Sequence, residues 1–184
     1  MVTMGTVKTL LTFEEFEQLP DQPGKQELVR GELIELPPAN YNHHVVAHRI
    51  YKGIDAAIER AHSRGEAPEL GAAFHEMGYL LLGKNWLQPD VSVTHAGQAV
   101  EKYLIGGPAI AIEVISPSNT AKRIAVKTEL YFECGALEVW CFFPKTKRVS
   151  NQVPGSVREI AADGFITMLL LPGLMLSVKE IFGD

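Results

Sequence analysis

The stretch Ala109-Ile-Ala-Ile-Glu-Val-Ile-Ser116 decides the fold of this chain. Its apolar run is typical of a strand buried on both faces, and such strands belong in the middle of sheets that helices cover. Glu113 lies near the end of the run, where an ionised carboxylate is costly unless it is paired, hydrogen-bonded or bound to a metal. Because ligands collect at the C-terminal ends of strands in open α/β sheets, Glu113 is the first candidate site residue. The competing interpretation is a structural Glu tied to a backbone group or an Arg.

A second carboxylate stands at the start of another short strand, Gln88-Pro-Asp-Val-Ser-Val93, where Pro89 occupies a tolerated first position. The chain between Asp90 and Glu113 is long enough for a strand, a loop and a return strand beside it. That arrangement would bring the two carboxylates to one place, where they would repel unless a cation neutralised them. Carboxylates, carbonyls and water are the ligands of Mg²⁺ and Mn²⁺, so the pair is a candidate divalent-metal site.

A helix is predicted downstream of the central strand, capped by Asn119 or Thr120 and closed near Cys134 by Gly135. Four of its residues share one stripe at helical spacing: Ile124, Lys127, Tyr131 and Cys134. Lys127 therefore points inward. Its ammonium either extends outward to solvent, as buried-side lysines usually do, or meets the Asp90 and Glu113 carboxylates and stabilises developing negative charge there.

These residues resemble a known nuclease pattern. Pro89-Asp90 followed by Glu113-Val114-Ile115 is similar to the PD-(D/E)XK motif, although Ile115 holds the position where Lys is usual. The wider sequence resembles the Uma2 family, also called DUF820, of restriction endonuclease-like proteins. The segments that carry this likeness are Gln26–Leu33, Gln88–Val93, Ile112–Ser118, Lys127–Tyr131 and Leu171–Leu174 with Ile181-Phe182.

The resemblance implies an α/β (α+β) fold with a restriction-endonuclease-like mixed central sheet flanked by helices. Length and composition agree with a single domain over residues 1–184, in which residues 1–9 are expected to form a flexible leader. The site would then use Asp90, Glu113 and the Val114 backbone carbonyl as ligands of Mg²⁺ or Mn²⁺. Lys127 and Glu27 would complete the catalytic group.

Two further residues are candidate substrate contacts, His43 from the family likeness and Arg123 as a departure from it. His43 matches a family histidine at the start of the first long helix, with His44 as the alternative if the register slips by one. Arg123 stands four residues before Lys127, where family members often carry an acid. The Asp-Pro that often ends the family's next strand is Phe143-Pro144 here.

Three functions are compatible with these features. The first is a metal-dependent endonuclease that hydrolyses the phosphodiester bonds of DNA. The second is a catalytically impaired module that binds nucleic acid or a protein partner without cleavage, which Arg123, a net charge of −5 and a pI of 5.7 favour. A hydrolase of a small phosphorylated ligand is the third, and the absence of a Gly-rich phosphate loop in the sequence counts against it.

Composition sets the broad class. With 184 residues and 46% hydrophobic content, the chain can bury one sizeable core. Two cysteines in no metal or disulfide spacing predict reduced thiols and a cytoplasmic protein. The sequence shows neither a secretory leader nor an apolar run of about 18 residues, so no membrane association is expected. A nuclease that cuts both strands would benefit from a homodimer.

Other patterns predict local structure. Thr12 to Glu15 reads as a capping box. A hairpin pivots at Arg30-Gly31, and its alternation turns Glu27 inward together with Val29. Asn40 or Asn42 begins a long helix that ends near Arg64. Residues 70–74 and 78–82 are expected to form a hairpin around His75-Glu76. His43, His44 and His48 suggest zinc only weakly, because a nearby third ligand is lacking.

Overall fold

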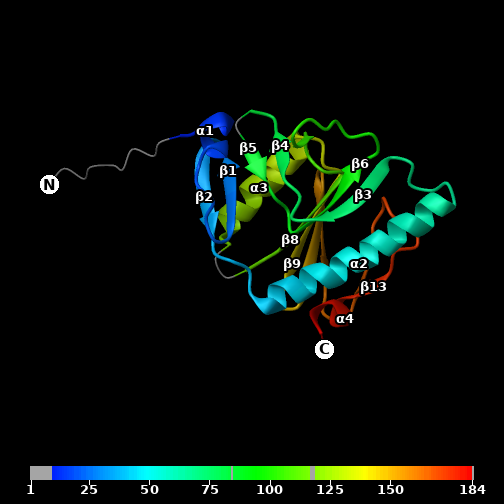
Figure 1. Cartoon of the computed structure of the whole chain (residues 1–184). Helices are drawn as coiled ribbons and strands as arrows, with labels where there is room; N and C mark the ends of the chain where they lie inside the picture. Colours follow the sequence, from blue (N-terminus) through cyan, green and yellow to red (C-terminus); the bar gives the residue numbers. More distant parts are fainter. Residues whose placement is uncertain (1–9, 84, 117–118, 184) are drawn as a thin grey trace.

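The computed structural model describes residues 10–83, 85–116 and 119–183. It shows the predicted mixture of helices and mixed sheets, with the long helix α2 crossing in front of the larger sheet in Figure 1. The expected leader, residues 1–9, lies outside the described residues. None of the helices in the described ranges is long and apolar enough to cross a membrane.

The predicted central strand is β8, and it lies inside a six-stranded sheet of order β11-β10-β9-β8-β6-β3. β8 runs parallel to β9 and antiparallel to β6, so the sheet is mixed. Its strands are β3 (Leu70–His75), β6 (Val91–His95), β8 (Ile110–Val114), β9 (Glu138–Phe143), β10 (Arg148–Val153) and β11 (Ser156–Ile160).

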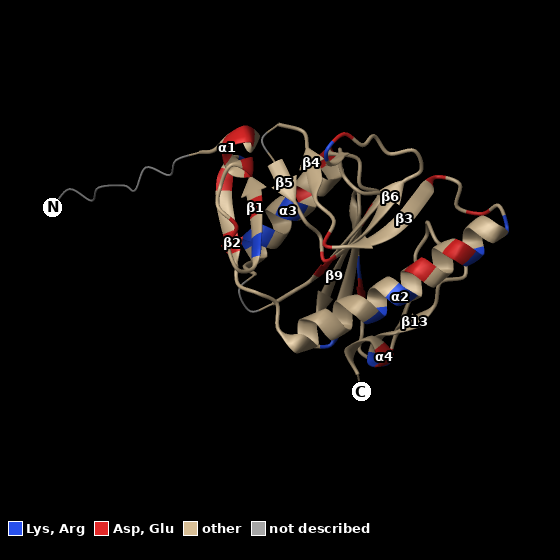
Figure 2. Cartoon of the chain, in the orientation of Figure 1, with Lys and Arg blue, Asp and Glu red and all other residues tan. Residues whose placement is uncertain are grey.

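A second sheet has five strands in the order β2-β1-β5-β4-β7. They are β1 (Lys25–Val29), β2 (Glu32–Leu36), β4 (Tyr79–Leu81), β5 (Asn85–Leu87) and β7 (Leu104–Ile105), and a small pair is made by β12 (Phe165–Ile166) and β13 (Leu176–Ser177). The helices are α1 (Phe13–Glu17), α2 (Tyr41–Ser63), α3 (Ala121–Glu133) and α4 (Val178–Phe182). In Figure 2, α1 is dominated by acidic residues, whereas α2 carries both signs of charge.

The two faces of β8 belong to two different cores, because successive side chains of a strand point to opposite faces. Ile110, Ile112 and Val114 pack in the core that includes the buried face of α2. Ala111 packs in the other core, which holds Tyr131 of α3 and residues of the five-stranded sheet. Glu113 follows Ala111 by two positions, so this alternation turns it toward α3.

Several predicted elements are confirmed. β1 and β2 form the hairpin, and Arg30 and Gly31 both have positive φ, 52° and 82°, as a tight two-residue turn requires. Thr12 and Glu15 form the capping box of α1. Asn40 caps α2 and Thr120 caps α3, which settles both open choices of capping residue.

The hairpin predicted around His75-Glu76 is wrong. β3 pairs with β6 in the six-stranded sheet, whereas β4 pairs with β5 and β7 in the other. Glu76, with φ 43°, lies between the two strands. The chain changes sheet because Ala73 packs in the α2 core while Tyr79 packs in the α3 core. A hairpin would have put both strands into one sheet.

Replacing Ile112 by Ala tests the central place of β8. Ile112 is fully buried in the core under α2. The substitution should lower the free energy of unfolding by about 2–5 kcal/mol, since it removes buried methylene groups and leaves a cavity. Urea denaturation gives this value. The control, Val157→Ala on edge strand β11, removes a side chain that is 63% exposed and should cost less than about 0.5 kcal/mol. Equal losses in the two variants would contradict this assignment.

Candidate functional site

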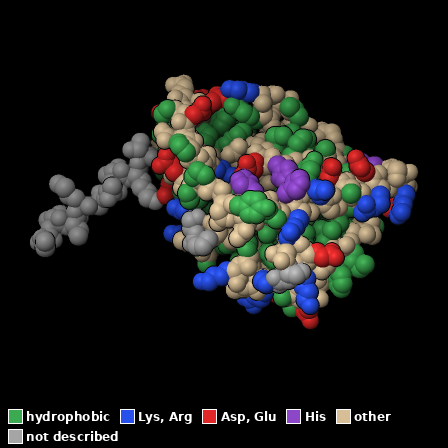
Figure 3. All heavy atoms as spheres, turned by 60° about the horizontal axis from the view of Figure 1, so that its bottom comes forward, with side chains coloured by type: hydrophobic (Ala, Val, Ile, Leu, Met, Phe, Trp, Pro, Cys, Tyr) green, Lys and Arg blue, Asp and Glu red, His purple; other side chains and the backbone are tan. Residues whose placement is uncertain are grey.

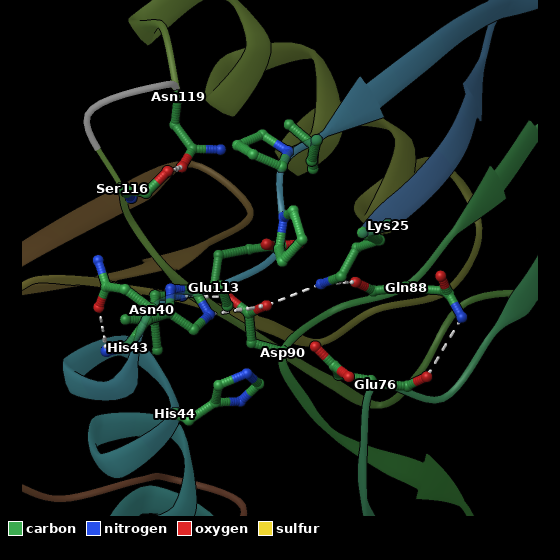
Figure 4. Close-up of a pocket in the computed structure, with 16 residues that line it drawn as sticks. Lys25, Asn40, His43, His44, Glu76, Gln88, Asp90, Glu113, Ser116 and Asn119 are labelled. Atoms are coloured by element: carbon green, nitrogen blue, oxygen red, sulfur yellow. Dashed lines mark hydrogen bonds and ion pairs between the residues drawn. The ribbon is translucent and has the colours of Figure 1, made fainter. Parts of the chain in front are cut away.

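A pocket of about 580 Å³ opens where β6 begins and β8 ends. Because these strands are antiparallel neighbours, the start of one lies beside the end of the other. The pocket is also lined by β1, the end of β2, the connection to α2, the first turn of α2, Glu76 and the loop after β8 (Figure 4). The pocket residues include Lys25, His43, Asp90, Glu113 and Val114. The strand arrangement therefore brings Asp90 and Glu113 to one place.

Asp90 is 4% exposed and both of its carboxylate oxygens have partners. Oδ2 accepts the backbone N–H of Val114 at 2.7 Å, which ties the start of β6 to the end of β8. Oδ1 lies 2.7 Å from Lys25 Nζ and 3.3 Å from His43 Nε2, contacts that Figure 4 shows as dashed lines. Burial alone would raise the pKa of Asp90, but the hydrogen bond from His43 and the charge of Lys25 outweigh it and lower the pKa. Asp90 is therefore ionised at neutral pH.

Glu113 is 8% exposed and lies on the α3 face of the sheet. Its Oε1 accepts the hydroxyl of Tyr131 at 2.7 Å and lies 2.7 Å from Lys127 Nζ. Burial raises the pKa of Glu113, Lys127 lowers it, and the negative charges of Asp90 and Glu27 raise it further, with a net upward shift. The carboxylates are thus close enough to repel one another.

Lys127 does not extend to solvent but bridges two carboxylates. Its Nζ lies 2.8 Å from Glu27 Oε1 and 2.7 Å from Glu113 Oε1, and the residue is 8% exposed. Burial alone would lower the pKa of Lys127, but the charges of Glu113 and Glu27 raise it well above its ordinary value. The ammonium is therefore protonated at neutral pH and acts as a hydrogen-bond donor rather than as a base.

Glu27 reaches the site from β1, as its alternation predicts. It is 1% exposed, and its Oε1 also accepts the backbone N–H of Gln88 at 3.2 Å. Lys25, two residues earlier on the same face of β1, donates from Nζ to Asp90 Oδ1 and to the Gln88 carbonyl at 2.8 Å. Lys25 was not among the residues predicted for the site, although the alternation that turns Glu27 inward applies equally to it.

The two expected substrate contacts occupy different environments. His43 lies in the first turn of α2, where its backbone N–H is capped by Asn40, and its ring contacts Asp90. His44 also lines the pocket, but the contact with Asp90 is made by His43. Arg123, in the first turn of α3, is exposed and is not among the described residues that line the pocket.

A second hollow of about 350 Å³ adjoins the pocket and shares His43, His44, Glu76 and Asp90 with it. His48 and His75 also line it, with their rings stacked at a centroid separation of 5.8 Å. In Figure 3, histidine side chains gather near the middle of one face, with Lys and Arg side chains around them.

Oxygen atoms dominate the donors that a metal ion would find here. The described ranges contain no group of three or more His, Cys, Asp or Glu side chains placed to share one ion. An ion at Asp90 and Glu113 would therefore take its other ligands from the Val114 carbonyl, water and substrate. Mg²⁺ is commonly bound in this way, through one or two carboxylates together with waters and phosphate oxygens.

Comparisons with known proteins agree with this architecture. The model of the Uma2 family, described as "Putative restriction endonuclease", matches residues 13–179. The crystal structure of a putative nuclease belonging to DUF820, from Anabaena variabilis ATCC 29413, superposes with a TM-score of 0.78 at 20% sequence identity. The alignment covers 94% of this chain and 97% of that one, and at this identity it shows the shared fold. No curated protein matches the chain.

The depressed pKa of Asp90 predicts how stability depends on pH. At pH values above the ordinary pKa of 3.8, ionised Asp90 stabilises the folded state. This contribution is lost as the pH falls through the lower pKa that Asp90 has in the folded state. Asp90→Asn should therefore cost about 1–3 kcal/mol near pH 7. The difference from the wild type should shrink below pH ~4. Urea denaturation across pH measures this, with exposed Asp21→Asn as the control. A difference that grows toward low pH would contradict the assignment.

Proposed function

The chain belongs to the Uma2 family, and from the geometry of its site we propose that it is an endonuclease that uses Mg²⁺ or Mn²⁺ to hydrolyse phosphodiester bonds in DNA. The observation that carries this proposal is the arrangement of Asp90, Glu113 and Lys127. Two carboxylates on adjacent antiparallel strands line one open pocket, and a buried ammonium lies against one of them. Family membership and fold support a nuclease, and the metal and the DNA substrate are our inference.

The donor set fits a hard divalent cation. Asp90, Glu113 and Val114 line the same pocket and offer two carboxylates and a backbone carbonyl. Repulsion from Asp90 contributes to the raised pKa of Glu113, and a cation between them would relieve it. A divalent ion held by these residues would lower the pKa of a bound water and offset charge on the phosphate.

The chain's own residues supply position and charge. Lys127 is fixed between Glu27 and Glu113, so its N–H groups have a defined direction with no cost of ordering the side chain during the reaction. Tyr131 donates to Glu113 and holds that carboxylate in place; burial and the negative charge of Glu113 raise its pKa well above the ordinary value, so its proton stays. Glu27 orients Lys127 and accepts from Gln88, next to the strand that carries Asp90.

Substrate contacts are proposed for His43, which the family likeness indicates, and for Arg123, which stands where family members often carry an acid. His43 lies at the pocket wall in the first turn of α2, where backbone N–H groups favour an anion. Arg123 is exposed in the first turn of α3, so it would meet a phosphate farther along a bound strand. The net charge of −5 makes such local contacts necessary, since the chain has no overall attraction for nucleic acid.

We further infer a cytoplasmic protein that acts as a homodimer. Cys134 and Cys141 are free thiols, and burial raises the pKa of Cys141 to about 12, which keeps that thiol unreactive. A dimer would place two copies of the pocket on the two strands of a duplex, and sedimentation equilibrium measures this state directly.

A nuclease-fold module without turnover is the second candidate. One observation favours it: Oδ1 of Asp90 already lies against Lys25 and His43, so the carboxylate is neutralised without a metal. Binding of a DNA duplex that weakens with salt, with no cleavage in Mg²⁺ or Mn²⁺, would support this module and contradict the endonuclease.

Glu113→Gln should abolish Mn²⁺ binding measured by calorimetry. It should also abolish nicking of supercoiled plasmid, because the amide keeps the size of the side chain but removes its charge. Exposed Glu159→Gln on β11 is the matched control and should bind and cut like the wild type. Mn²⁺ affinity retained in Glu113→Gln would sink the metal assignment.

Lys127→Met should lower the cleavage rate by roughly a hundredfold or more, since a preorganised donor is lost. The protein should still bind Mn²⁺, because Asp90, Glu113 and the Val114 carbonyl remain. Removal of this buried cation also takes away the positive charge shared by Glu27 and Glu113, so a loss of roughly 3 kcal/mol in unfolding free energy is expected. Cleavage at the wild-type rate by folded protein would rule out a catalytic part for Lys127.

A further inference from the structure

Lys25 differs from the other site lysine in what it faces. The Lys127 side chain is enclosed by Glu27, Glu113 and the α3 core. Lys25 lines the open pocket, and its side chain is 15% exposed. Figure 4 shows it reaching across the pocket to Asp90. Its ammonium is therefore the site cation that an entering ligand meets first.

Lys25 forms an ion pair with the carboxylate that a metal ion would bind. Its Nζ is 2.7 Å from Asp90 Oδ1, while Oδ2 of the same carboxylate accepts the Val114 N–H. A divalent ion that binds Asp90 through either oxygen comes within a few ångströms of a positive charge, and like charges so close repel strongly in a part-buried site. The ion and the ammonium thus compete for Asp90.

The sum of the charges in the site shows what an exchange of Lys25 for a divalent ion would change. With all five groups ionised, Glu27, Asp90 and Glu113 carry three negative charges, and Lys25 and Lys127 carry two positive ones. Without ligands, these five groups leave the site with a single negative charge. One divalent ion would make it positive by one, and one phosphodiester would then make it neutral. One divalent ion and one phosphodiester together therefore balance the five ionised groups.

We infer that Lys25 is a placeholder cation, which neutralises Asp90 in the metal-free protein and is released to a substrate phosphate when a divalent ion binds. This inference rests on the proposed function and adds to it a positioning residue for the phosphate. The second partner of Lys25 is the Gln88 carbonyl at 2.8 Å, a neutral acceptor that does not oppose the release as a carboxylate would. A lysine side chain is flexible enough to follow this exchange.

The first test is a calorimetric Mn²⁺ titration of wild type, Lys25→Met and Lys102→Met. Lys102 is a matched control, because it is a surface lysine paired with Glu17 by an exposed salt bridge. Lys25→Met should bind Mn²⁺ about tenfold more tightly, since one neighbouring positive charge is gone. Lys102→Met should match the wild type. Unchanged or weaker binding by Lys25→Met would overturn the inference, and Lys25→Gln gives a second reading if Lys25→Met does not fold.

The same titration separates this inference from the proposed function. Wild-type binding that Lys25→Met leaves unchanged defeats the placeholder role alone. Tight binding by Lys25→Met with weak or undetectable binding by the wild type supports it. If neither protein binds Mn²⁺, the metal-dependent function fails and the placeholder role fails with it.

The second test asks where Lys25 goes. The affinity for a short mixed-sequence DNA duplex is measured by fluorescence anisotropy in EDTA and in Ca²⁺, a cation that takes the same oxygen ligands. Lys25→Met should change the affinity less than about twofold in EDTA, where Asp90 holds the ammonium, and weaken it about tenfold in Ca²⁺. An equal loss in both conditions would mean that Lys25 contacts DNA without any release by an ion, which contradicts the proposal.

Discussion

The structure depends on one electrostatic constraint: three carboxylates are buried together, and among the described residues two lysines lie between them. Glu27, Asp90 and Glu113 come from β1, the start of β6 and β8, and each is less than a tenth exposed. Burying them unpaired would be prohibitive. The position of β1 beside the six-stranded sheet is what lets Lys25 and Glu27 reach strands that lie far from them in sequence. The five-stranded sheet thus contributes directly to the site, besides covering the second core.

A carboxylate on the neighbouring strand shows that burial alone does not make a site. Glu138 of β9 is 2% exposed, yet its partners are neutral donors: the Trp140 indole, the Asn151 amide and the Leu170 N–H, at 2.7, 3.1 and 3.2 Å. It is not among the described residues that line the pocket. Glu138 therefore has the purely structural role that was the competing interpretation of Glu113. The two differ in their neighbours, since Glu113 meets an ammonium and two other carboxylates beside an open pocket.

The sequence predicts most of the features that follow from the spacing of apolar residues along a strand or a helix. The apolar run of β8, the stripe of α3 and the alternation of β1 each follow from a local repeat, so the inward positions of Glu113, Lys127 and Glu27 could be read before the structure. Lys25 was missed because it was predicted to lie in the turn before β1, and its partner Asp90 is distant in sequence. The separation of β3 from β4 was missed for a related reason. Which sheet a strand joins depends on which core accepts its side chains, and adjacent apolar segments do not reveal that.

The charge pairing also explains why the site can exist before any metal binds. In structural zinc sites the ligands have no other partners, so the metal supplies the folding energy. Here Asp90 has Lys25, His43 and the Val114 N–H, and Glu113 has Lys127 and Tyr131. In the described residues, no buried side-chain polar atom lacks a hydrogen-bond partner. An ion would therefore exchange one set of charge contacts for another, and its effect on stability would be limited to what preferential binding to the folded state contributes. A site built in this way is preformed, and what a cation changes in it is the distribution of charge presented to a phosphate.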